Sequence, residues 1–205
     1  MSFKIMPRRV LAIAAACLAV VASAAGATND GPIRGWISEP GVEPPSYAVT
    51  EPVENGLNVD TVVLLCNEVA GQRSLELDLY LTDEGPLLPR GADAKTLKED
   101  PRVEIAIDDR VFPAQLLFAD DYVVVADSTE GPQGQGFQVP TLSGGLLDAM
   151  QRGEKMTLRF DLLARAKGEP ARFDSEFTVD LVSGRSAIAG VRRCAAPRTR
   201  NQVAG

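Results

Sequence analysis

Strict alternation of apolar and polar residues is the feature that most limits how this chain of 205 residues can fold. In segment 74–82, SLELDLYLT, leucine occupies every second position, and segments 155–163 (KMTLRFDLL) and 173–181 (FDSEFTVDL) alternate in the same way. A two-residue period is that of a strand with one face on a core and the other toward solvent. The outward face of the first of these strands is then polar and carries Glu76, Asp78 and Tyr80.

Further strand patterns accompany these three. Segment 58–66 is apolar on both faces in its second half, as a central strand is, and we expect it to form a hairpin with segment 74–82 across a turn at 67–73. A proline inside a strand lacks the amide hydrogen of the ladder, so Pro113 predicts an edge or a bulge. The series continues in segments 103–108, 111–118 and 121–127.

Two short helices complete the expected elements. Ser143 is a suitable N-cap for a helix of about ten residues that Gly153 ends. A second helix follows the turn at 183–186 and ends on Cys194, with Ser186 as its N-cap. The sequence therefore predicts a mainly β fold, an antiparallel β-sandwich or barrel of about seven to eight strands with two short helices.

The N-terminus has the features of a secretory signal peptide at 1–27. Basic residues precede an apolar run at 10–21, which is too short to span a bilayer core of about 30 Å, and small residues follow it. The alternatives are a twin-arginine signal at Arg8 and Arg9 and lipid attachment at Cys17. We expect a periplasmic or secreted protein that does not insert into a membrane after cleavage.

The mature chain divides by composition into three parts. Segment 28–56 is rich in proline and is expected to be an extended arm, with Trp36 as an anchor to the body. Segment 57–195 has the length and pattern of a single β-rich domain. Segment 196–205 is expected to be a flexible tail.

Two cysteines remain after signal removal, Cys66 and Cys194. In an oxidising compartment they allow one disulfide, and the alternative is two buried, unpaired thiols. In the chain-entropy model, a bond that closes a loop of this length contributes about 4 to 5 kcal/mol to stability. We therefore expect a disulfide on which the fold depends.

Composition excludes several functions. The chain has no histidine, which removes Ser-His-Asp and Cys-His triads and histidine-ligated zinc. It also lacks a C-x-x-C pair and the glycine-rich phosphate loops. Loss of the signal peptide changes the net charge from −7 to −10, which opposes binding to nucleic acid. We expect no catalytic residue, cofactor, metal or nucleic-acid partner.

Three short patterns resemble functional motifs, and each has a simpler structural explanation. Segment 123–129 resembles the Asp-Ser/Thr-Gly strand of aspartic proteases but lacks the glycine, and Gly184-Arg185-Ser186 is half of a hydrolase elbow. Acidic residues near strand ends could supply oxygen ligands for calcium, but hairpin turns also explain them. These acidic residues are Asp108, Asp109, Asp120, Asp121 and Asp127.

The C-terminal half resembles a known group. A helix LLDAMQRG leads into a strand and a polar loop, then into F-T-V-D-L-x-S-G-x-S-A-I and a terminal cysteine. Over residues 139–194 this arrangement resembles exported proteobacterial proteins related to the invasion-associated locus B family. The resemblance implies a secreted or periplasmic β-rich domain without established enzymatic residues, so it assigns no site.

These observations favour a non-catalytic periplasmic or secreted protein that binds an envelope protein or a small ligand. We expect the binding surface on loop 127–138 and the arm, because long loops on a rigid scaffold often carry function. Its candidate residues are Trp36, Asp127, Gln133 and Gln135. One alternative is a hydrolase that uses two of Asp108, Asp120 and Asp127, whose carboxyl groups would have to lie within about 5 to 10 Å. Another is a structural subunit of an envelope assembly.

Overall fold

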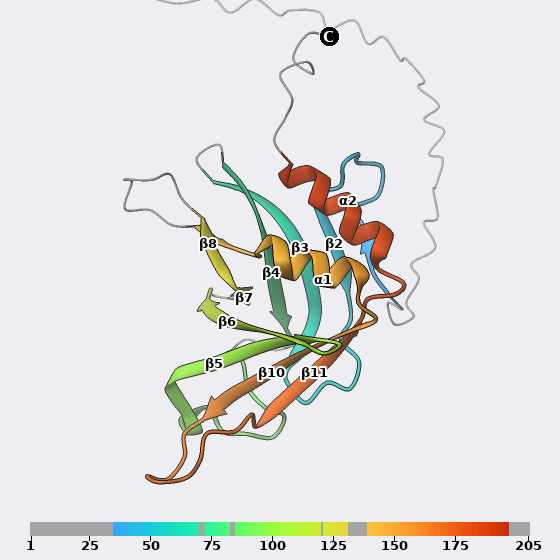
Figure 1. Cartoon of the computed structure of the whole chain (residues 1–205). Coiled ribbons are helices and arrows are strands. Elements are labelled where there is room, and N and C mark those ends of the chain that lie inside the picture. The colour runs from blue at the N-terminus through green and yellow to red at the C-terminus, as the bar shows by residue number, and fades with distance from the viewer. Residues whose placement is uncertain (1–34, 70–71, 83–84, 120, 131–138, 197–205) are drawn as a thin grey trace, which may run out of the picture. The chain divides into compact units, whose positions relative to one another are not determined.

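One antiparallel sheet of nine strands forms the body of the protein, in the order β1-β2-β3-β4-β7-β6-β5-β10-β11 (Figure 1). The computed structural model describes residues 35–69, 72–82, 85–119, 121–130 and 139–196, which all lie in one unit, residues 32–205. The mainly β, antiparallel fold class is therefore confirmed. The strands are β1 (Ile37–Ser38), β2 (Tyr47–Thr50), β3 (Val59–Val69), β4 (Gln72–Leu81), β5 (Leu97–Ile107), β6 (Arg110–Phe118), β7 (Tyr122–Ala126), β10 (Lys155–Leu163) and β11 (Ser175–Asp180).

The sheet curls until its two edges meet. Val53, just after β2, forms an antiparallel bridge with Thr178 of β11. The Val53 amide donates to the Thr178 carbonyl at 2.7 Å, and the Thr178 amide donates back at 2.9 Å. In Figure 1, β5, β10 and β11 run across the direction of β3 and β4. The curled sheet is therefore closed like a barrel at this bridge.

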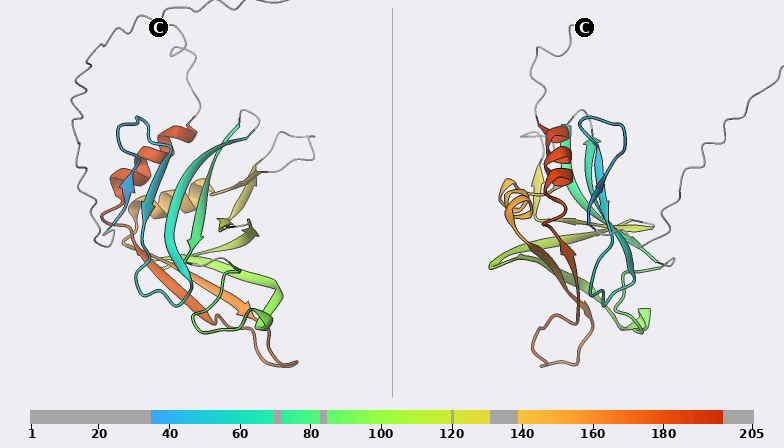
Figure 2. Two further views of the ribbon diagram at one scale, coloured as in Figure 1. Left: turned by 180° about the vertical axis from the view of Figure 1, so that it is seen from behind. Right: turned by 90° about the vertical axis from the view of Figure 1, so that its right-hand side faces the viewer.

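The core lies inside the curl and under two helices, α1 (Gly144–Arg152) and α2 (Arg185–Ala195). Leu75, Leu77 and Leu79 of the alternating strand β4 face it, as predicted, and are almost completely buried, and Leu81 at the end of the strand is partly buried. Helix α2 packs on β1 to β4 and on α1, and Figure 2 shows the two helices side by side on one side of these strands. A two-stranded sheet, β8 (Ser128–Glu130) with β9 (Val139–Thr141), and a 3-10 turn, Ala94–Thr96, complete the elements.

The helix ends follow the predicted signals at α1 but not at α2. Ser143 caps α1, and its Oγ accepts a hydrogen bond from the Leu146 amide at 3.2 Å. At the other end Gly153 leaves no room for a side chain, because a Cβ there would lie 2.5 Å from Ile107 Cγ2. The prediction that Ser186 caps α2 is wrong, since Gly184 is the N-cap and no side chain bonds there.

Three strands extend beyond their predicted ends. β3 runs to Val69 and β4 begins at Gln72, so most of the turn expected at 67–73 is paired backbone. β5 begins at Leu97, six residues before the expected segment 103–108, because Leu97 pairs with Leu163 at the end of β10. At each extension the backbone pairs with a neighbouring strand, and polar side chains in the extension do not prevent this backbone pairing.

The proline-rich segment 28–56 is not separate from the domain over its described part, because it supplies β1 and β2 to the sheet. Trp36 is an anchor, as expected: its side chain is 7% exposed and its Nε1 donates to the Asp180 carbonyl at 3.0 Å. Its ring lies against Gly184, where a Cβ would come within 2.1 Å of Trp36 Cδ1. The expected signal peptide and residues 197–205 of the expected tail lie outside the described residues.

Pro113 occupies a local edge, in agreement with its predicted position. β6 lies between β5 and β7, but β7 pairs only with Gln115 to Phe118. At Pro113 the strand has β5 as its paired neighbour, through Glu104. Pro113 lacks an amide hydrogen, and β6 tolerates this because β7 does not pair with it at that position.

A disulfide ties β3 to α2. The Sγ atoms of Cys66 and Cys194 lie 2.35 Å apart, so the predicted pair is at bonding distance. Arg73 Nη1 donates to the Cys194 carbonyl at 2.8 Å and holds the end of α2 against the β3–β4 hairpin. None of the helices in the described part of the chain is long and apolar enough to cross a membrane.

Candidate functional site

A pocket of about 250 Å³ opens where β5, β6 and β10 meet the loop at 164–174. It lies on the outer face of the sheet, because Arg102 and Glu104 alternate on β5 with the buried residues Val103 and Ile105. The lining residues are Arg102, Val103, Glu104, Pro113, Asp161, Ala171, Arg172 and Phe173. Pro113 therefore contributes to this pocket from the local edge of β6.

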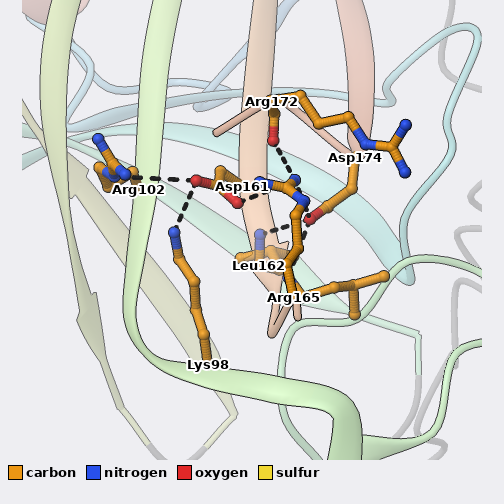
Figure 3. Close-up of polar contacts among 8 residues, drawn as sticks. Lys98, Arg102, Asp161, Leu162, Arg165, Arg172 and Asp174 are labelled. Atoms are coloured by element: carbon orange, nitrogen blue, oxygen red, sulfur yellow. Dashed lines mark hydrogen bonds and ion pairs between the residues drawn. The ribbon is translucent and has the colours of Figure 1, made fainter. Parts of the chain in front are cut away.

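Asp161 lines the pocket and is only 4% exposed. Figure 3 shows its carboxylate among Lys98, Arg102 and Arg165. Its Oδ2 lies 2.7 Å from Lys98 Nζ and 3.8 Å from Arg102 Nε, both on β5. Its Oδ1 lies 3.1 Å from Arg165 Nη2. A buried carboxylate must be paired to be tolerated, and three cations surround this one.

Asp174 connects the loop to β10. The pairing of β10 with β5 shifts between Asp161 and Leu163, which leaves backbone amides without a partner in the ladder. Asp174 Oδ2 accepts from the Leu162 amide at 3.0 Å and from the Leu163 amide at 2.9 Å. Arg165 adds an ion pair to the same oxygen at 3.5 Å. The bulge and the loop therefore fix each other.

Arg165 also closes the loop, because its Nη2 donates to the Arg172 carbonyl. The Arg172 guanidinium itself is directed away from Asp161 in Figure 3. It forms no hydrogen bond or ion pair with any described residue, and its side chain is exposed. Arg102 is also largely free, since its side chain is 64% exposed and its one ion pair is 3.8 Å long. The pocket is thus lined by two arginines whose guanidinium donors are largely unused by described residues, although the Arg172 group is turned outward.

The acidic groups at the pocket are already engaged. Glu104 Oε1 lies 3.2 Å from Arg159 Nη1, which also pairs through Nε with Glu176 at 3.4 Å. The charged residues that line the pocket, together with their ion-pair partners, are five cations and four carboxylates. This local excess of positive charge contrasts with the net charge of −7 of the whole chain. The cations are Lys98, Arg102, Arg159, Arg165 and Arg172, and the carboxylates are Glu104, Asp161, Asp174 and Glu176. The spare charge is positive, which suits an anion.

The residues expected to bind a ligand do not meet at one site. Trp36 is buried against Gly184 at the start of α2. Asp127 lies at the start of α1, where its carboxylate accepts from the Ser143 amide at 2.6 Å and from Ser143 Oγ at 2.5 Å. Both side chains are engaged in structural contacts. Gln133 and Gln135 lie outside the described residues.

The expected carboxylate pair is also not assembled by the described residues. Asp127 follows Ala126, which pairs with Gln115, and Asp108 lies in the turn that ends at Arg110. At about 3.4 Å per residue, five residues of β6 separate the two by roughly 17 Å. Asp108 instead accepts from the Glu154 and Lys155 amides just after α1. Asp120 lies outside the described residues.

A second unusual group lies on the outer face of β4. The prediction that Glu76 and Asp78 face solvent is wrong, because both are buried and Asp78 is only 2% exposed. Val63 of β3 and Val124 of β7 are the cross-strand neighbours of Asp78. Alternation identifies the face on which a side chain lies, but the exposure of that face depends on its neighbours.

Burial controls the protonation of these two acids. Burial, followed by the nearby charge of Glu76, raises the pKa of Asp78 to about 7. Burial also raises the pKa of Glu76, and the hydrogen bond from Asn67 Nδ2 at 2.9 Å opposes this increase. Tyr80 and Tyr122 stack beside them with ring centroids 5.5 Å apart, and desolvation with nearby acids raises the pKa of each phenol.

The fold and the pocket define a class, a closed antiparallel β protein with a small cationic pocket on its outer face. Comparisons with protein-family models, curated proteins and solved structures gave no match. The resemblance to the invasion-associated locus B family therefore stays a prediction. Over the ranges that the structure describes, no three histidine, cysteine, aspartate or glutamate side chains are placed to hold a metal ion.

Proposed function

We propose that the protein is a non-catalytic binding protein of the bacterial envelope, and that it holds a small ligand in the pocket between β5, β6, β10 and the loop at 164–174. The observation that carries this proposal is a pocket with the buried Asp161 in its lining and two exposed arginines, Arg102 and Arg172, whose guanidinium donors are largely unused by described residues. Concave sites with a few convergent polar groups are typical of ligand binding.

The chemistry of the pocket supports binding over catalysis. Glu104 and Asp161 each form ion pairs, with Arg159 in one case and with Lys98 and Arg165 in the other. A general base has to reach the substrate, and these carboxylates are directed to neighbouring cations. The chain also has no histidine that could act instead.

Export supports the envelope location. The signal-like N-terminus and a cysteine pair at bonding distance are both typical of proteins of an oxidising compartment. A binding protein in that compartment would meet small molecules that enter the cell envelope. The partner class in this proposal is a small ligand, with an envelope protein as the competing partner.

Ligand-observed NMR on the oxidised mature chain, residues 28–205, tests the proposal. The panel contains small carboxylic acids, phosphate esters, amines and neutral sugars. We expect one class to bind and to be lost in Ala171→Phe, because a phenyl ring at this exposed lining position fills much of a pocket of about 250 Å³.

Ala119→Phe is the matched control, since Ala119 is also exposed but does not line the pocket. This variant should bind like the wild type. Binding that is equal in both variants would place the ligand elsewhere and contradict the proposal. Turnover of an ester, peptide or glycan substrate that Ala171→Phe abolishes would contradict its non-catalytic part.

A further inference from the structure

We infer that this pocket selects a small organic anion, a carboxylate or phosphate group on a short aromatic or aliphatic body. In this inference Arg102 binds the anionic group, and the exposed Arg172 side chain, which is directed away from Asp161 in Figure 3, turns toward the pocket to bind it as well. Phe173 with Pro113 forms the apolar wall. The inference rests on the proposed function, and it adds the chemical class of the ligand.

The charges of the pocket favour an anion over a cation. A cationic ligand would need a free carboxylate, but Asp161 is taken by Lys98 and Arg165 and Glu104 is taken by Arg159. The two guanidinium groups are largely unpaired, since Arg102 has one ion pair of 3.8 Å and the Arg172 side chain has none among the described residues. Guanidinium groups bind carboxylate and phosphate oxygens with two parallel hydrogen bonds.

The wall of the pocket favours an apolar body on the ligand. Phe173 is 43% exposed although it is a large aromatic residue beside the mouth. Pro113 and Ala171 line the same pocket and are also exposed, and neither side chain can donate a hydrogen bond. A ring or short chain that packs against these residues would remove their apolar surface from water.

The size of the pocket limits the ligand. Its volume of about 250 Å³ is below the range of roughly 300 to 1,000 Å³ of sites for drug-sized molecules. One ring with one anionic group is therefore the largest ligand that could be mostly enclosed. Benzoate and phenyl phosphate have this size and chemistry and serve as probes.

The base of the pocket is already ordered, which lowers the cost of binding. Lys98 and Arg165 fix Asp161, and Asp174 fixes the loop through the Leu162 and Leu163 amides. The two arginine side chains are then the exposed part of the site, and the rest of it is fixed by ion pairs and hydrogen bonds. Such preorganisation directs a larger share of the interaction energy into affinity.

Isothermal titration calorimetry of the oxidised mature chain with benzoate, phenyl phosphate, benzyl alcohol and inorganic phosphate tests this inference. We expect the wild type to bind at least one aromatic anion, to bind inorganic phosphate more weakly and to ignore benzyl alcohol. R102Q/R172Q should weaken anion binding about tenfold or more, because it removes both charge-assisted partners. Preference between benzoate and phenyl phosphate identifies the anionic group.

R152Q/R185Q is the control, because it removes the same charge from two arginines on α1 and α2 that do not line the pocket. It should leave anion affinity within about twofold of the wild type at about 0.15 M salt, where the Debye length of about 8 Å screens exposed charges that lie farther away. Equal weakening in both double variants, or binding of benzyl alcohol as tight as benzoate, would overturn the inference.

Two failures are distinguishable. If neither aromatic anion binds but amines or sugars bind and are lost in Ala171→Phe, the ligand class is wrong and the proposed function stands. If no member of either set binds in a way that depends on Ala171, the inference and the proposed function both fail.

Discussion

Asp78 is an acid in surroundings that oppose its charge. It lies between Val63 and Val124 on neighbouring strands, its Oδ1 has no hydrogen-bond partner, and its titratable neighbours are Glu76, Tyr80 and Tyr122. Its pKa rises from 3.8 to about 7, so the folded protein holds a proton that the unfolded chain releases. The stability that this proton provides is complete below about pH 4 and is lost as the pH rises to about 7.

Asp78→Asn should remove this dependence. One pKa unit corresponds to about 1.36 kcal/mol. The free energy of unfolding of the variant, relative to that of the wild type, should therefore be about 4 kcal/mol higher at pH 8 than at pH 4. Urea denaturation at each pH measures the difference, and titrating groups that are not electrostatically coupled to Asp78 cancel because both proteins carry them. Parallel curves for the two proteins across this range would show that Asp78 titrates normally.

Asp161 should be important for stability as well as for the pocket. Asp161→Asn leaves Lys98 and Arg165 largely buried without their carboxylate partner. Removal of one member of a buried ion pair costs about 3 to 5 kcal/mol, and some remaining exposure of the two cations places this case near 3 kcal/mol. The midpoint of urea denaturation should fall accordingly.

Arg102→Gln is the comparison for Asp161→Asn. Arg102 contacts the same carboxylate, but its side chain is 64% exposed and the distance is 3.8 Å. Exposed pairs contribute about 0 to 1 kcal/mol, so this variant should unfold near the wild-type midpoint. A loss as large as that of Asp161→Asn would mean that the network depends on Arg102.

At the scale of elements, the contact between β1 and α2 depends on a glycine. Gly184→Ala would place a Cβ 2.1 Å from Trp36 Cδ1, so the ring has to move. We expect a loss of about 2 to 3 kcal/mol, as for overpacked cores, and a red shift of the fluorescence of Trp36, which is the one tryptophan of the chain. Gly144→Ala, which meets nothing within 4 Å, should leave both readouts unchanged.

Elements with a clear period and a terminal signal can be predicted from this sequence. β10 spans the alternating segment 155–163, and Ser143 and Gly153 mark the ends of α1 as expected. β1 could not be predicted in this way, because it has two residues and pairs through Val49 and Ala48 of β2. Such a strand depends on tertiary contacts more than on its own sequence.

The pocket was not predicted, for a related reason. Arg102 is 59 residues from Asp161 in sequence, and the pocket forms only because β5 pairs with β10 and the loop that carries Arg172 returns beside them. Asp161 occupies the polar face of an alternating strand, where the pattern indicates solvent. No spacing between these residues distinguishes a buried, three-cation site from ordinary surface charge.

For the whole molecule, the Cys66–Cys194 bond should dominate stability. It closes a loop with a sequence separation of 128 residues, for which the chain-entropy model gives about 4 to 5 kcal/mol. Denaturation with and without dithiothreitol should differ by this amount, and Cys66→Ala/Cys194→Ala should match the reduced protein. Equal stability of the oxidised and reduced forms would contradict this prediction.

Because α2 lies near the end of the chain, the domain can finish folding only after this helix is present. This helix covers strands from the first third of the chain, and Trp36 needs the backbone at Asp180 and Gly184. A nascent chain released from the ribosome only as far as β10 would leave β2 and β3 uncovered. The body can therefore be completed only when α2 is present, and any stop codon before residue 185 should yield an aggregation-prone fragment.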